Sequence, residues 1–108
     1  MVKAIRFHEF GGPGVLKYED VEIGDPGLGE IRVHHTAIGF NFLDVLVREG
    51  KYPVLPELPA IPGGEAAGTV VALGPNVKDF TVGQRVAYAA TIPGSYAEDR
   101  LLEAGHAI

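Results

Sequence analysis

Glycine and proline divide this chain into short segments, and this limits what it can fold into. The 108 residues include 15 glycines and 8 prolines, and residues of these two types end regular structure or set turns. Between the turns, apolar and polar residues alternate as they do in half-buried strands. Strands are expected over residues 2–10, 15–23, 30–40, 66–73, 85–90 and 94–102.

One segment changes to a helical period. Residues 41–50 are predicted to form a short helix, with Asn41 as its N-cap, Asp44 three residues later and Gly50 just past its end. Residues 52–62 carry a proline every third position, which predicts an extended, irregular segment. Residues 77–84 are predicted to form a loop anchored by Phe80 and Val82. The fold class predicted from these patterns is mainly β: one domain, residues 1–108, built as a small, partly open β-barrel with one or two short helices.

Composition excludes several classes of function. The net charge is −5 and the basic residues are scattered, so a nucleic-acid partner is not expected. The chain has no cysteine, so neither a disulfide framework nor a thiolate metal site can form. Its first residues alternate charged with apolar side chains, unlike a signal peptide, and no run is long enough to span a membrane. We therefore expect a cytoplasmic protein that does not bind membranes.

A single carboxylate stands out in the stretch 61–75. Glu65 follows Gly63 and Gly64 and precedes an apolar strand, so it is expected to be a paired structural carboxylate or part of a site. The segment is not a dinucleotide loop of the G-x-G-x-x-G type, because Glu65 takes the place of the middle glycine and a strand follows where a helix is needed.

Other candidate residues have structural interpretations. His34 and His35 are adjacent on a predicted strand, so they face opposite sides and are expected to be surface or half-buried residues. Asn41 and Asp44 fit a capping box, with Asp44 also spaced to pair with Arg48, and taken alone this reading is favoured by roughly two to one. Tyr52 fits a packed aromatic residue with a solvated hydroxyl.

Four motifs follow one another along the chain: G-F-N-F-L-D-V-L-V-R-E-G-K-Y-P, L-P-A-I-P-G-G-E-A-A-G-T-V-V-A-L-G-P-N-V, F-T-V-G-Q-R-V-A-Y and G-S-Y-A-E. In this order they resemble the zinc-independent quinone oxidoreductases, a zeta-crystallin-like group of the medium-chain dehydrogenase/reductase superfamily, over about residues 2–102. The resemblance implies a GroES-like catalytic domain that packs beside a Rossmann domain. It also implies transfer of hydride from NADPH to a quinone or another electron-poor carbonyl compound, and a homodimeric full-length protein.

The resemblance also assigns site residues. In zinc-dependent relatives a cysteine and a histidine bind the metal, and here Asn41 and Gly64 stand at those positions, so no zinc is expected. Catalytic roles are implied for Asn41, Tyr52 and Asp44. Contacts with the cofactor are implied for Asn41, Phe42, Gly64 and Glu65. Leu46 replaces a tyrosine found in some relatives.

The chain ends at Ile108, before any cofactor-binding domain of the Rossmann type. We therefore expect the isolated chain to be folded but inactive. The alternative is a stand-alone GroES-like binding or co-chaperonin-type module, for which residues 11–16 superficially resemble a mobile loop.

Overall fold

The structure is a computed structural model that describes residues 1–89 and 92–108. Its strands are β1 (Val2–Phe7), β2 (Leu16–Val21), β3 (Glu30–Ile38), β4 (Glu65–Leu73), β5 (Arg85–Ala89) and β6 (Asp99–Glu103). The helix α1 spans Phe42–Arg48, and 3-10 turns lie at Pro13–Val15 and Ala104–His106. The prediction of a mainly β domain with few short helices is confirmed.

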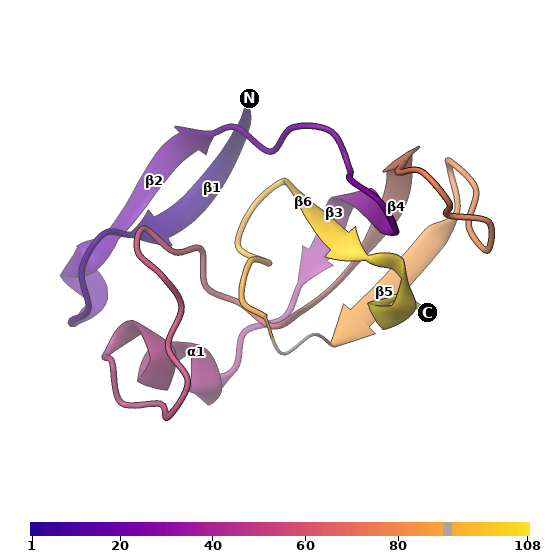
Figure 1. Cartoon of the computed structure of the whole chain (residues 1–108). Helices are drawn as coiled ribbons and strands as arrows, with labels where there is room; N and C mark the ends of the chain where they lie inside the picture. Colours follow the sequence, from indigo (N-terminus) through magenta and orange to yellow (C-terminus); the bar gives the residue numbers. More distant parts are fainter. Residues whose placement is uncertain (90–91) are drawn as a thin grey trace.

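Two antiparallel sheets make up the strands. β1 pairs with β2, and the second sheet has the order β5-β4-β3-β6. The β1–β2 pair and α1 lie at one end of the molecule and the four-stranded sheet at the other (Figure 1). Isolated bridges between Ala4 and Ala97 and between Phe7 and Ala60 join the ends. The result is the partly open barrel expected from the sequence.

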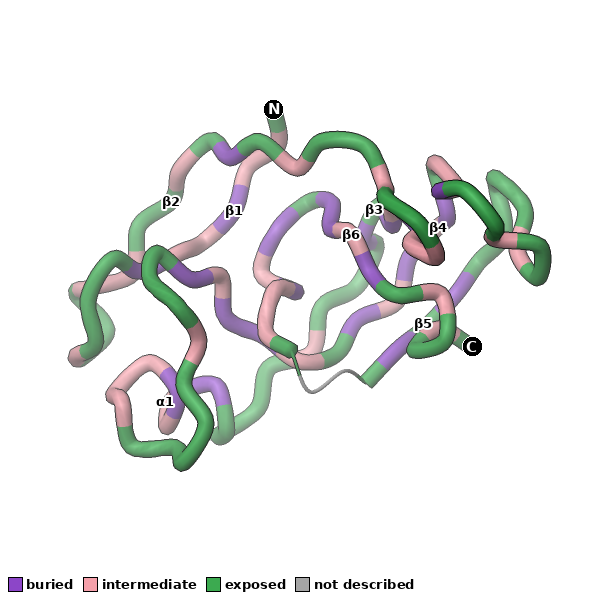
Figure 2. Tube along the Cα trace, in the orientation of Figure 1, coloured by how far each residue is buried: buried purple, intermediate pink, exposed green. Residues whose placement is uncertain are grey.

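The main core lies on one face of the four-stranded sheet. Alternate residues of the strands turn inward, and β-branched side chains suit this pleated surface. The buried members of this cluster are Ile31, Val33, Ala66, Val70, Val86, Tyr88 and Leu102. Figure 2 shows the resulting change between buried and exposed residues along the strands. A smaller cluster of Phe7, Val47 and Ala60 fastens α1 to β1.

Several predicted boundaries were wrong. β1 ends at Phe7 and β2 spans only Leu16–Val21, because the flanking residues have no ladder partner. Residues 94–98 are not strand: the amides of Gly94 and Ser95 donate to the Gly63 carbonyl, and that of Tyr96 to the Pro62 carbonyl. Residue 90, predicted as the end of a strand, lies outside the described residues.

Two side chains also differ from expectation. His35 is buried, with 8% of its surface exposed, because alternation along β3 places it on the same inward face as Ile31 and Val33. His34 is exposed as predicted. Val82, expected to anchor the loop before β5, is 63% exposed, whereas Phe80 and Val77 of this loop pack against the core.

The helix α1 follows β3 directly and begins as predicted. Asn41 is its N-cap and forms a capping box with Asp44, while Gly50 after its end has a φ of 75°. The expected Asp44–Arg48 ion pair is absent: Arg48 instead donates to the Gly11 carbonyl (3.2 Å) and approaches Glu49 (4.0 Å). Over the described residues, no helix has the length and apolar character needed to cross a membrane.

Candidate functional site

A cavity of about 930 Å³ lies beside the start of α1. Its walls come from α1, from the proline-rich segment, from the turn before β4 and from residues next to the end of β5. Five of the residues assigned from the resemblance line it: Asn41, Asp44, Tyr52, Gly64 and Glu65. Residues far apart in the sequence thus meet at one site.

Phe42, the sixth assigned residue, is not among the lining residues. As the first residue of α1 it points outward, with 70% of its surface exposed. Tyr52 borders the cavity and is 39% exposed. The two aromatic residues are therefore placed differently with respect to the cavity.

Asp44 is the most constrained polar residue of the cavity wall. Only 8% of its surface is exposed. Its Oδ2 accepts two hydrogen bonds, from the Asn41 amide (3.1 Å) and from the Tyr96 hydroxyl (2.7 Å). Both donors are uncharged, and Oδ1 has no hydrogen-bond partner among the described residues. Asp44 is thus held by one oxygen, which leaves the other for a ligand.

The turn before β4 depends on glycine. Gly63 has a φ of 101°, a conformation that residues with side chains rarely adopt, and a Cβ there would overlap the ring of Tyr96. The Gly63 carbonyl accepts from the amides of Gly94 (2.9 Å) and Ser95 (3.2 Å). The turn at Gly63 and Gly64 is therefore joined by hydrogen bonds to residues 94 and 95.

Glu65 opens β4 at the edge of the cavity. Its side chain is exposed and lies over Gly39, where a Cβ would collide with it, and its carbonyl accepts from the Gly39 amide (3.0 Å). No ion pair of Glu65 is found within the described residues. Exposure removes the need for a charged partner, so the description as a paired structural carboxylate does not fit Glu65, and its role in a site stays a prediction.

The charge of the cavity wall is negative. Asp44, Glu57 and Glu65 line it, while the described lining residues include no lysine or arginine. Such a wall disfavours anionic groups such as phosphates and accepts hydrogen bonds from neutral amides and hydroxyls. An uncharged, polar ligand group fits it best.

A buried polar network lies behind the site. Nδ1 of His35 bonds the Ala97 carbonyl (2.7 Å), and Nε2 bonds the Tyr88 hydroxyl (2.8 Å), which reaches Ser95 Oγ (2.7 Å). Because a carbonyl only accepts, Nδ1 carries the proton. Burial, with a further contribution from Arg100, lowers the pKa of His35, so the ring is neutral near pH 7.

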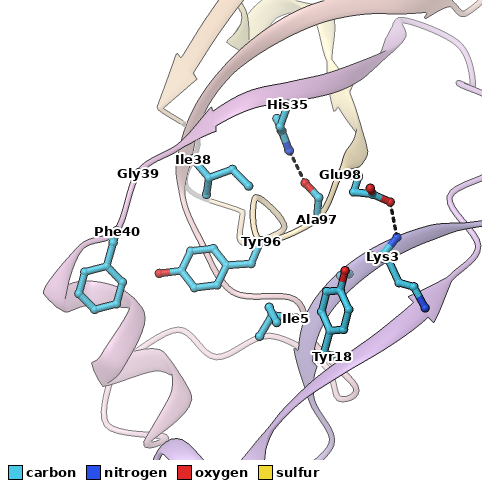
Figure 3. Close-up of a pocket in the computed structure, with 11 residues that line it drawn as sticks. Lys3, Ile5, Tyr18, His35, Ile38, Gly39, Phe40, Tyr96, Ala97 and Glu98 are labelled. Atoms are coloured by element: carbon cyan, nitrogen blue, oxygen red, sulfur yellow. Dashed lines mark hydrogen bonds between the residues drawn. The ribbon is translucent and has the colours of Figure 1, made fainter.

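A second, smaller cavity of about 380 Å³ lies between β1, β2 and the end of β3. Figure 3 shows its walls, in which the Tyr96 ring stands between Ile5 and Ile38. Burial and then the neighbouring Asp44 carboxylate raise the pKa of the Tyr96 phenol, so its hydroxyl stays protonated. Reasoning from sequence missed Tyr96 as a site residue. Its only signal was its place in the G-S-Y-A-E motif.

Comparisons with known proteins agree with this geometry. Residues 27–106 match the alcohol dehydrogenase GroES-like domain. The chain is 48% identical over 102 residues to a quinone oxidoreductase of Pseudomonas aeruginosa, covering 94% of this chain and 31% of that protein. It is 45% identical over 106 residues to a 2-haloacrylate reductase of a Burkholderia species, covering 96% and 32% respectively.

Solved structures show the same relation. A Pseudomonas syringae quinone oxidoreductase superposes with a TM-score of 0.95 at 44% identity, over 100% of this chain and 33% of that one. An Escherichia coli quinone oxidoreductase complexed with NADPH gives a TM-score of 0.92 at 42% identity, over 98% and 32%. The chain thus spans about a third of the length of these relatives. With its matching motifs, barrel and cavity, the chain belongs to the alcohol dehydrogenase GroES-like domain family.

Proposed function

We propose that this chain is the substrate-side domain of an NAD(P)H-dependent quinone oxidoreductase that works without zinc. The observation that carries the proposal is the cavity beside α1, which brings Asn41, Asp44 and Tyr52 together. The similarity to quinone oxidoreductases from several bacteria supports the reaction class. Cytoplasmic location and homodimerisation of the longer protein stay predictions.

The cavity fits one end of a nicotinamide coenzyme. Its acidic wall would repel the phosphates, whereas Asp44 can accept a hydrogen bond from a carboxamide or a ribose hydroxyl. Gly64 carries no side chain, so a flat ring can approach the backbone there. Bound in this way, the coenzyme would supply the hydride, and its phosphates would be held outside the cavity described here.

The acceptor needs orientation and a hydrogen bond at its oxygen. The Asn41 side-chain amide borders the cavity and has two N–H donors, and the Tyr52 hydroxyl is a second donor. Preorganised donors of this kind stabilise the charge that develops on a carbonyl oxygen during reduction. A quinone or an enone is already electron-poor, so such donors are sufficient without a Lewis acid.

Zinc-free chemistry is supported by the donor set. Asn41 and Gly64 stand where the resemblance places the metal ligands of zinc-dependent relatives, and a carboxamide and a hydrogen atom are poor replacements for thiolate and imidazole. Both residues lie on the cavity wall. Asn41 can therefore donate a hydrogen bond to a carbonyl acceptor where a zinc ligand would otherwise stand. Gly64 offers no side-chain ligand for a metal.

A chimera tests the proposal. This chain would replace the matching third of the Pseudomonas aeruginosa quinone oxidoreductase, and coenzyme oxidation would be followed with a benzoquinone and with a 2-haloacrylate. We expect reduction of the quinone at a rate near that of the parent enzyme, unchanged after treatment with a chelator. A chimera that folds and binds NADPH but reduces neither acceptor would contradict the proposal, and restoration of activity by added zinc would contradict its zinc-free part.

The isolated chain provides the complementary test. We expect it to be folded and to show no NADPH-dependent quinone reduction, since the phosphates have no binding site in the cavity described. Sedimentation distinguishes the stand-alone module: a monomer or loose dimer agrees with an enzyme domain, whereas a heptameric ring would favour a co-chaperonin-type assembly.

A further inference from the structure

We propose that Tyr96 is a positioning residue of the cavity beside α1, fixing the distance between the start of the helix and the turn before β4. Its hydroxyl holds Asp44 and its ring packs against Gly63. The inference rests on the proposed function, because its catalytic consequence is that Asn41 and Asp44 stay aligned with a bound ligand.

The hydroxyl side of Tyr96 sets the carboxylate. The Tyr96 hydroxyl donates to Asp44 Oδ2 at 2.7 Å, and the Asn41 amide donates to the same oxygen at 3.1 Å. Two donors converging on one oxygen fix the rotation of the carboxylate and leave Oδ1 as its remaining acceptor. A bond from an O–H donor to a charged acceptor is among the stronger hydrogen bonds of proteins. The first turn of α1 is therefore fastened from outside the helix.

The ring side of Tyr96 sets the turn. The ring lies so close to Gly63 that a Cβ at this glycine would overlap ring atoms. Gly63 and Asp44 both line the cavity, on different segments of the chain. Tyr96 is thus in contact with two of the cavity's walls, through one edge of its ring and through its hydroxyl.

Tyr96 is itself immobilised by its neighbours. Its amide donates to the Pro62 carbonyl (3.0 Å), and its carbonyl accepts from the Ile5 amide in β1 (2.8 Å). The preceding Ser95 is fully buried and bonded to Tyr88. Figure 3 shows the ring between Ile5 and Ile38, with its hydroxyl on the side of Phe40. A side chain held at its backbone, ring and hydroxyl is suited to transmit a fixed geometry.

Packing alone does not require a tyrosine here. A phenylalanine ring could fill the same space beside Gly63, Ile5 and Ile38, so the hydroxyl is the part of the residue that a purely structural role leaves unexplained. Its protein partner is Asp44, a residue of the cavity wall. This separation of ring and hydroxyl makes the proposal testable by one conservative substitution.

The first test uses this 108-residue chain and needs no enzymatic activity. Tyr96→Phe removes the hydroxyl and keeps the ring, and Tyr18→Phe makes the same change at a tyrosine that is 70% exposed. We expect Tyr96→Phe to shift the amide NMR signal of Asn41 and to lower its protection from hydrogen exchange about tenfold, with β5 and β6 unchanged. An Asn41 amide that behaves alike in Tyr96→Phe, Tyr18→Phe and the unmodified chain would overturn the proposal.

A spectrophotometric titration gives a second readout on the same chain. Tyr96 should titrate later than the exposed tyrosines, since burial and Asp44 raise its pKa. Asp44→Asn should bring this late titration to lower pH, because the carboxylate charge contributes to the shift. Burial keeps the titration later than that of the exposed tyrosines in either case, so the contradicting result is a Tyr96 titration that Asp44→Asn does not shift at all.

The second test uses the chimera with Pseudomonas aeruginosa quinone oxidoreductase. Misalignment of reacting groups lowers turnover, so Tyr96→Phe should reduce kcat about tenfold while KM for NADPH changes less than about twofold. Equal kcat values for Tyr96→Phe and Tyr18→Phe would overturn the catalytic part. An inactive parent chimera would instead show failure of the proposed function, and the NMR experiment would still decide the role of Tyr96.

Discussion

Two buried aspartates in this domain are held in opposite ways. Asp99, 7% exposed, accepts from Arg32 at one oxygen (2.8 Å) and from His34 at the other (2.7 Å), so its charge is neutralised and both oxygens are used. Asp44, 8% exposed, accepts only uncharged donors at one oxygen. A carboxylate whose charge is satisfied internally serves the fold, whereas one left uncompensated at a cavity is available to a ligand.

The surroundings explain the difference. Asp99 opens β6 and joins it to β3 through side chains of Arg32 and His34 on the neighbouring strand. Burial alone would raise the pKa of Asp99, but hydrogen bonds from His34 and Arg32 outweigh it and lower the pKa. Asp44 lies in the first turn of α1, where the backbone amides favour a negative charge without a cation.

The largest effect is expected for Asp99→Asn. This change places an amide opposite Arg32 and His34 and removes the charge that they share, so it should lower the free energy of unfolding by about 2–3 kcal/mol. Chemical denaturation of the chain measures this loss. The matched change Asp44→Asn should cost much less, and equal losses at the two sites would break the distinction between them.

A somewhat smaller effect on stability is expected for Gly63→Ala. This substitution affects Asp44 indirectly, through the Tyr96 ring that packs against Gly63. The substitution strains a φ of 101° and pushes the Tyr96 ring away from the turn, at a cost of about 2 kcal/mol. Gly83→Ala is the control, since its φ of 96° is similar but nothing lies within 4 Å of the added Cβ. If both changes cost the same in thermal melts, the ring does not press on the turn.

Asp44→Asn itself should cost about 1 kcal/mol of stability, because the amide oxygen can still accept from Tyr96 and Asn41. Its main effect should be on function: in the chimera we expect kcat/KM to fall at least about tenfold, as one acceptor and one charge are lost at the cavity. Full activity of Asp44→Asn with normal stability would contradict this prediction, because it would show that neither ligand binding nor folding needs the charge of Asp44.

Local sequence patterns predicted much of this fold. The features that they missed depend on contacts between residues that are distant in the sequence. The helix with Asn41 as its N-cap was predictable because caps and helical spacing are local signals. The position of Tyr96 was not, since its bond to Asp44 spans 52 residues and no periodicity encodes it. The burial of His35 was missed because alternation along β3 could not show that Tyr88 and Ala97, distant in the sequence, bond its ring on the inward face.

For the site, too, the sequence predicted which residues take part better than it predicted how distant segments contact one another. The resemblance selected residues on three separate segments, and the structure placed Asn41, Asp44, Tyr52, Gly64 and Glu65 around one cavity. The roles of these residues stay predictions. Alternation alone gave a strand over residues 94–102, because it could not show that the amides of this segment bond the Pro62–Gly63 turn instead of a ladder.

The smallest effect on stability is expected from a change of pH. It separates the contribution of His35 from that of Asp99, because the two residues lose protons in different pH ranges. His35 has a lowered pKa when folded and an ordinary value of about 6.5 when unfolded. The unfolded chain therefore binds more protons as the pH falls below about 6.5, and stability decreases until the folded pKa is reached. The lowered pKa of Asp99 adds a separate loss only below about pH 4.

Unfolding free energies measured between pH 7 and pH 5 test this order. His35→Gln should flatten the upper part of the profile, while His106→Gln, at a ring that is exposed near the C-terminus, should leave it unchanged. A profile with no slope above pH 5 in the unmodified chain would mean that protonation of His35 is not linked to unfolding.

Gly39 sets the position of the Glu65 side chain although it has no side chain of its own. The Glu65 side chain occupies the space where a Cβ of residue 39 would be. Gly39→Ala would therefore redirect a carboxylate at the cavity edge and leave the net charge of the protein unchanged. The orientation of the Glu65 carboxylate thus depends on residue 39 having no side chain. A substitution at this position would change which acceptors fit the cavity, although residue 39 itself has no functional group.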